Sequence, residues 1–152
     1  MAKKEAYFTR ARANRGVKLP LLTPEGKDEG DWLWVLGIDS DAFREAKAEL
    51  NRRIVGVASL KDEAEKKRAT KEEEYRLIAA LVTGWSFEDP YTPEAMMELL
   101  TEAPQIARTI DDFVYSRASF FRALSGSSPD TQKAPSASES APADLPSPSE
   151  AT

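Results

Sequence analysis

The sequence predicts a mainly α-helical domain of about four helices, with a small N-terminal β-hairpin and a disordered C-terminal tail. Three observations support this fold class. Apolar residues alternate with polar ones near the N-terminus, recur at helical spacing from residue 40 to residue 124, and almost vanish from residues 125–152. We therefore divide the chain into a basic arm (1–16), a helical domain with the hairpin (17–124) and a Pro/Ser/Ala-rich tail (125–152).

Two apolar runs on either side of a turn segment predict the β-hairpin. Val17, Leu19 and Leu21 alternate with other residues and stop at TPEGKDEG, whose proline and glycines favour a turn; DWLWVLGI follows as a second extended run. The edges of a hairpin leave backbone groups unpaired. Pairing between subunits, and hence a homo-oligomer, is therefore one expectation.

The first predicted helix begins at three capping candidates, Asp39, Ser40 and Asp41. Its apolar stripe consists of Phe43, Ala46, Leu50, Ile54 and Val57. The charged stretch SLKDEAEKKRATKEEEY that follows is either a solvated helix or a mobile link. Helical spacing resumes in a second stripe, formed by Tyr75, Ile78, Leu81 and Val82. Gly84 is expected to end that helix in a left-handed turn.

Two further helices are expected after the connector TGWSFEDPYTPE. Thr92 is a hydroxyl cap, Pro93 suits the first helical position and Glu94 lies beside the positive end of the helix dipole. This helix carries AMMELLTEA and ends before Pro104. A last helix, QIARTIDDFVYSRASFFRAL, has a broad apolar stripe made of Ile106, Ile110, Phe113, Val114, Phe121 and Leu124.

The connector is unusually aromatic for a loop, because it contains Trp85, Phe87 and Tyr91. These rings either plug the end of the groove between two helices or contact a partner protein. Met96 and Met97 are adjacent on a helix and cannot both face inward, so we expect one near the surface, where flexible side chains suit adaptable binding. These five residues are our candidate protein-binding site.

The residue types present argue against an enzyme. The chain has no Cys and no His, which excludes thiol nucleophiles and removes the commonest general base and transition-metal ligand. The neighbouring acids in Asp111-Asp112 and Glu88-Asp89 point in different directions on a helix. Capping explains Asp39 and Asp41 better than binding of a hard cation does. We therefore expect no catalytic residue, no cofactor and no metal.

Charge and hydropathy bear on partners and location. The formal net charge of −5 argues against general nucleic-acid binding. The first eighteen residues are basic, and a flexible solvated arm is expected there, with contact to nucleic acid as the alternative. No apolar run is long enough to span a membrane and the start lacks the apolar centre of a secretory signal, which predicts a soluble, cytoplasmic protein without membrane contact.

Residues 125–152 include eight serines and five prolines, no aromatic residue, and Leu145 as the one aliphatic larger than alanine. Such a segment buries too little apolar surface to offset the entropy lost on ordering. This composition predicts the disordered tail.

The order of segments resembles a known family. DWLWVLGIDSDAFREA is followed by NRRI, by LIAALVTGWSF and by PYTPEAMMELLTEAPQIARTIDDFVYSRASFFRAL. The pattern is a helix, G-W, a short loop, P-Y-[ST]-P-E, a helix, a proline and a helix ending in R-x-x-F-F. From about Val17 to Leu124, the chain resembles the tail assembly chaperones of long-tailed, siphophage-type bacteriophages.

The resemblance implies a non-enzymatic role in virion assembly, in the cytoplasm of the infected host cell. Proteins of this family bind the tape measure protein, keep it soluble and help the tail tube to polymerise around it. A longer product of translational frameshifting commonly recruits the tail tube protein. Two alternatives stay open: a structural virion protein, such as a minor tail or head-tail completion component, and a small DNA-binding regulator that uses the basic N-terminus.

Overall fold

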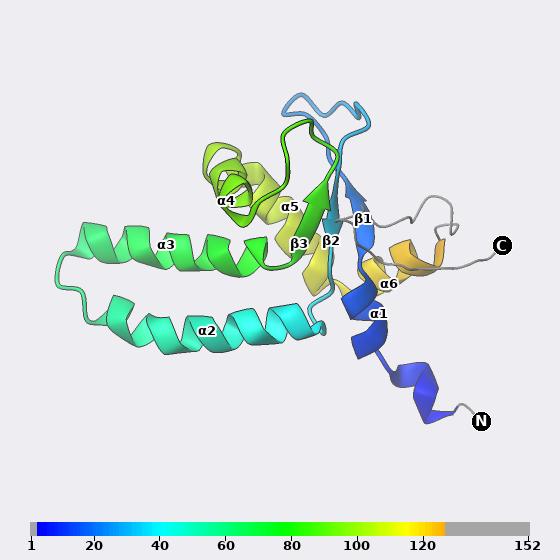
Figure 1. Cartoon of the computed structure of the whole chain (residues 1–152), viewed down its shortest axis with the longest axis horizontal. Coiled ribbons are helices and arrows are strands. Elements are labelled where there is room, and N and C mark those ends of the chain that lie inside the picture. Colours follow the sequence, from blue (N-terminus) through cyan, green and yellow to red (C-terminus); the bar gives the residue numbers. More distant parts are fainter. Residues whose placement is uncertain (1–2, 127–152) are drawn as a thin grey trace.

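The computed structural model describes residues 3–126 and confirms a mainly helical fold with an N-terminal hairpin (Figure 1). Six α-helices are present in this range, rather than about four, and the predicted tail lies almost entirely outside it. The elements are η1 (Lys4–Tyr7), α1 (Arg10–Arg15), β1 (Val17–Pro20), β2 (Trp32–Val35), α2 (Asp41–Ala58), α3 (Glu63–Ala79), β3 (Val82–Trp85), α4 (Pro93–Glu102), α5 (Pro104–Tyr115) and α6 (Arg117–Gly126).

The sheet has three antiparallel strands in the order β1-β2-β3. The predicted hairpin is confirmed, with Val17 opposite Val35 in β1 and β2. The expectation for Gly84 is wrong: it lies in β3 opposite Trp34, and it is not among the glycines with positive φ. A helix could end before Val82 and leave a strand because β2 offers an open edge, and β-propensity depends on such context.

The strands of the hairpin have neighbours within the chain, and this bears on the expectation that hairpins pair between subunits. β3 occupies the second edge of β2. α6 packs against β1, the strand at one edge. At the other edge, the Tyr91 hydroxyl donates to the Val82 carbonyl of β3 at 2.6 Å. The β2 edge of the hairpin is therefore paired within the chain, and pairing between subunits stays a prediction.

Helices α2 and α3 form an antiparallel pair that extends away from the sheet (Figure 1). Ser40 is confirmed as the cap of α2, because its Oγ accepts from the Phe43 amide at 3.2 Å. The charged stretch is a helix and not a link. The Asp62 carboxylate begins it by accepting from the Ala64 amide at 3.3 Å. Of the stripe predicted on α2, only Phe43 is buried, because the distal half of the pair has left the body of the fold.

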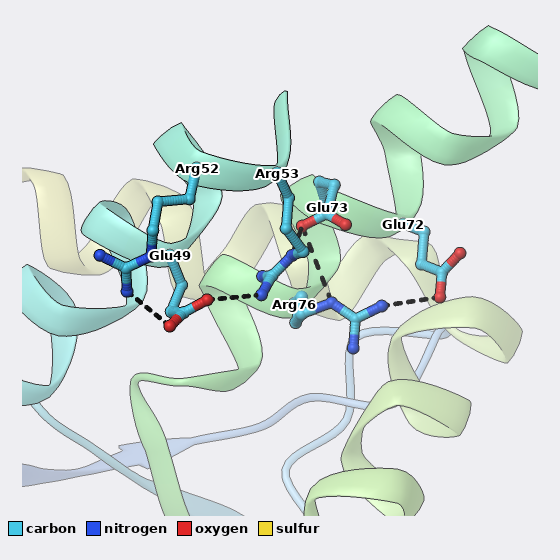
Figure 2. A network of polar contacts seen from close by, with 6 residues as sticks. All are labelled: Glu49, Arg52, Arg53, Glu72, Glu73 and Arg76. Atoms are coloured by element: carbon cyan, nitrogen blue, oxygen red, sulfur yellow. Dashed lines mark hydrogen bonds and ion pairs between the residues drawn. The ribbon is translucent and has the colours of Figure 1, made fainter. Parts of the chain in front are cut away.

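A network of ion pairs joins the two helices (Figure 2). At its centre is Glu73, which is 8% exposed. Its Oε1 lies 2.9 Å from Arg53 Nε on α2 and 3.7 Å from Arg76 Nε on α3. Arg53 also contacts Glu49 at 3.2 Å. The outer members, Arg52 with Glu49 and Arg76 with Glu72, are exposed pairs within one helix and contribute little to stability. The buried carboxylate, which bridges both helices, fixes how α2 and α3 align.

The main core lies between the sheet and the later helices. Leu33 and Val35 of β2 meet Met96 and Leu100 of α4 there, together with Ile110 of α5. The predicted caps and the end before Pro104 are confirmed: α4 starts with Thr92 Oγ1 accepting from the Ala95 amide at 3.0 Å and ends at Glu102.

The single last helix that the sequence predicted is two helices. The chain leaves helical geometry at Ser116, where φ is −91° and ψ is 92°. The Ser116 Oγ then accepts from the Ser119 amide at 3.2 Å, which caps the start of α6. The break lets α6 turn towards β1, where Phe120 and Leu124 pack with Val17 in a second cluster. Phe121, predicted on the core stripe, is half-buried while Phe120 is buried.

Residues 10–15 form α1 and pack on the fold, so the expectation of a flexible solvated arm is wrong for them, whereas η1 before them has no buried residue. Ala13 of α1 is fully buried. Arg10 forms two hydrogen bonds with the Asp41 carboxylate, at 2.6 and 2.8 Å. The Trp34 indole donates to the Arg15 carbonyl at 3.1 Å. These contacts hold α1 against β2 and the start of α2. The charge of Arg10, which the sequence suggested was solvated, is paired with Asp41.

Candidate protein-binding surface

The three connector aromatics form one cluster at the end of β3. The ring centroids of Trp85 and Phe87 are 5.2 Å apart, and those of Trp85 and Tyr91 are 5.1 Å apart, both edge-to-face. All three side chains are half-buried and pack against the main core. Edge-to-face pairs of this kind contribute about 0.5–1.5 kcal/mol each beyond the area they bury.

The polar atoms of this cluster are satisfied within the chain. Trp85 Nε1 donates to the Asp89 carbonyl at 2.7 Å, which closes the connector on itself. The Tyr91 hydroxyl donates to Val82, and burial raises the pKa of Tyr91 to about 12. Ser86 ties the connector to β2, because its Oγ accepts from the Trp32 amide at 2.8 Å. The connector is thus held in one shape, while part of each ring still faces solvent. It joins β3 to α4, and Trp85 ends β3, so the connector does not link two helices as the plug interpretation assumed.

The two methionines on α4 differ as their spacing predicts. Met96 is completely buried beside Leu100 and cannot meet a partner without unfolding of the core. Met97 is half-buried, as is Leu99. The members of the candidate site that a partner can reach are therefore Trp85, Phe87, Tyr91 and Met97, whereas Met96 belongs to the buried core.

This arrangement suits binding through an apolar surface. A pre-formed cluster of rings with internal hydrogen bonds loses little side-chain entropy when a partner covers it. The half-buried Met97 on α4 can adapt to the shape of an apolar helix face.

The acids considered as metal ligands or catalysts do not gather in one site. Asp39 is held by Arg117, with Oδ2 2.8 Å from Nε, and this partner lowers the pKa of Asp39. Asp41 is held by Arg10, which lowers its pKa as well. Burial and then the neighbouring Asp112 raise the pKa of Asp111. Within residues 3–126 no group of three or more carboxylates is close enough to hold a metal ion.

Other apolar side chains are exposed where the sequence predicted burial or gave no expectation. Ile54 and Val55 lie on the distal half of α2, and Leu22 lies in the loop between the first two strands. Tyr7 and Phe8 lie at the N-terminus, and Tyr115 ends α5. The helical spacing of Phe43, Ala46, Leu50, Ile54 and Val57 suggested that Ile54 faced the core. The sequence held one indication that Ile54 is exposed, namely the highly charged composition of the helix that follows α2.

Comparisons with known proteins leave the family open. No family model, no curated protein and no solved structure matches the chain. None of the helices in the part of the chain that the structure describes is both long and apolar enough to cross a membrane.

Proposed function

We propose that this chain is a non-enzymatic bacteriophage tail assembly chaperone that binds the tape measure protein and keeps it soluble in the cytoplasm of the infected host cell. One observation carries the proposal furthest. Trp85, Phe87 and Tyr91, which lie in the segments that carry the family resemblance, form one pre-formed cluster of rings that stays partly exposed, and the helix that follows leaves Met97 half-buried. In a purely structural connector, the same pattern would need no ring left half-exposed.

The proposed client is an amphipathic helical segment of the tape measure protein. Its apolar face would cover Phe87, Tyr91 and Met97, because apolar helices bind grooves and ridges through anchors spaced by three or four residues. The tail tube protein is a second proposed partner, through a longer frameshifted form of this chain. The surface of this chain supplies binding and no chemistry.

Co-expression with the tape measure protein of the same phage tests this proposal. The wild-type chain is expected to keep the client in the soluble fraction and to co-purify with it. Met97→Asp places a charge in an apolar interface and is expected to release the client, because an unpaired buried ion is costly. Met97→Leu is the matched control, because its volume and polarity are similar and it should retain the client.

Met97 is half-buried, so the fold of each variant has to be checked by circular dichroism and thermal unfolding. Met97→Gln provides a second variant without a charge if Met97→Asp does not fold. A folded Met97→Asp or Met97→Gln that still keeps the client soluble contradicts the assigned surface. A wild-type chain that leaves the client insoluble, or that persists in finished virions, contradicts the chaperone function and favours a structural virion protein.

A further inference from the structure

The distal part of the α2–α3 pair is a basic projection on an acidic protein. Residues 50–68, which we call the distal hairpin, have six cationic and three anionic side chains, a formal charge of +3. The chain as a whole carries −5. Lys61, Lys67 and Arg68 are exposed, and none of them forms an ion pair with another residue of the described range. Their charge is therefore available to a partner.

Apolar surface accompanies this charge. Val55 is 70% exposed and Ile54 is 37% exposed. Arg53 points towards α3 because it pairs with Glu73. Val55, two residues later, is turned by about 200° and so faces away from α3. A β-carbon added at neighbouring Gly56 would meet no atom within 4 Å. Within this chain, nothing in residues 3–126 covers this side of α2.

A complementary surface lies elsewhere on the same chain. Residues 21–31, the acidic loop between β1 and β2, have four acids and one lysine, a formal charge of −3. Glu25 and Glu29 are exposed and form no ion pair with any described residue. Leu22, at the base of this loop, is 59% exposed. The loop thus matches the distal hairpin in both respects, with opposite charge and with an exposed aliphatic side chain.

One molecule cannot join these two surfaces. Figure 1 shows the acidic loop above the sheet and the distal hairpin far out to one side, at the end of the α2–α3 pair that points away from the sheet. We propose that the distal hairpin of one copy of this chain binds the acidic loop of a second copy. Because the two surfaces differ, the contact is heterologous, and each copy keeps one free surface of each kind to which a further copy can add.

Sedimentation velocity of the purified chain tests this inference independently of any client. At about 0.02 M salt the average mass should rise with protein concentration to at least about twice that of one chain. At about 0.5 M salt it should fall to the mass of one chain, because screening over a few ångströms removes the attraction.

Charge reversal identifies the two surfaces. Lys67→Glu with Arg68→Glu makes the distal hairpin acidic, and Glu25→Lys with Glu29→Lys makes the loop basic. Each double variant alone should stay at the mass of one chain. An equimolar mixture of the two should associate again, because the hairpin variant keeps the acidic loop, the loop variant keeps the basic distal hairpin, and these two unchanged surfaces can pair. Lys3→Glu with Lys4→Glu changes the net charge as much as the hairpin variant does and should associate like the wild type.

Circular dichroism of each variant first establishes that it is folded. A wild-type chain that keeps the mass of one chain at low salt overturns the inference and leaves the distal hairpin to a different kind of partner. Folded variants that fail to associate when mixed also overturn it. Continued self-association of the loop variant would mean that another acidic segment occupies the distal hairpin, and it would likewise overturn the inference.

Discussion

Replacing Trp85 by alanine should measure how firmly the connector anchors the fold. The change removes two edge-to-face ring pairs, at 5.2 and 5.1 Å, and the hydrogen bond to the Asp89 carbonyl. Truncating a fully buried Trp costs about 3–5 kcal/mol, and each ring pair adds about 0.5–1.5 kcal/mol. Because Trp85 is half-buried, we expect about 3 kcal/mol, at the lower end of that range.

Urea unfolding followed by far-ultraviolet circular dichroism provides the measurement. Fluorescence is less suitable, because Trp32 and Trp34 remain in the variant. Trp85→Phe is the matched comparison: it keeps an aromatic ring and loses the N–H donor, so it should cost about 1 kcal/mol.

A loss below about 1 kcal/mol for Trp85→Ala would refute the anchoring argument, since truncation at an unpacked surface position costs that little. The aromatic cluster would then be attributed to partner binding alone. A large loss for Trp85→Ala combined with a small one for Trp85→Phe would assign the stability to ring packing and not to the hydrogen bond.

Three further predictions concern the α2–α3 pair and the start of α2. Glu73→Ala should cost about 1–3 kcal/mol in urea unfolding because it removes the buried carboxylate that joins Arg53 of α2 to α3, whereas Glu72→Ala, at an exposed pair, should cost less than about 0.5 kcal/mol. Gly56→Ala should raise stability by about 0.4–1 kcal/mol, since an added β-carbon meets nothing and alanine favours the helix; a lower melting temperature would contradict this. Arg117 lowers the pKa of Asp39, so this pair stabilises the fold above the ordinary pKa of the carboxyl, and the stabilisation disappears as pH falls through the lowered pKa. In Asp39→Asn, the free energy of unfolding measured from pH 7 to pH 2 should therefore depend less steeply on pH than in the wild type.

The parts of the fold that depend on neighbouring residues were predictable from the sequence. Ser40 and Thr92 cap their helices because a hydroxyl reaches an amide three residues ahead, whatever the rest of the chain does. Met96 and Met97 differ in burial because adjacent helical residues point about 100° apart. The candidate site could be found by the same means, as aromatic residues in a segment that proline and glycine keep irregular.

The break between α5 and α6 was not predicted, although a local signal existed. The apolar stripe continues across Ser116, and no proline or glycine interrupts it. Ser116 is nevertheless a capping residue three positions before Ser119, and it caps the new helix. The reason for the break is a long-range contact: the turn at Ser116 lets Phe120 reach Val17 in β1.

By itself, the sequence determined the helical class, the N-terminal hairpin, the helix starts and the aromatic cluster, because spacing and capping act over three or four residues. The tertiary structure decided what is covered. Val82 to Trp85 became a strand because β2 had an open edge 47 or more residues earlier in the chain. Ile54 stayed exposed despite its apolar spacing because α2 and α3 together leave the body of the fold. Burial and strand pairing depend on which distant segments come into contact, and local sequence patterns do not determine those contacts.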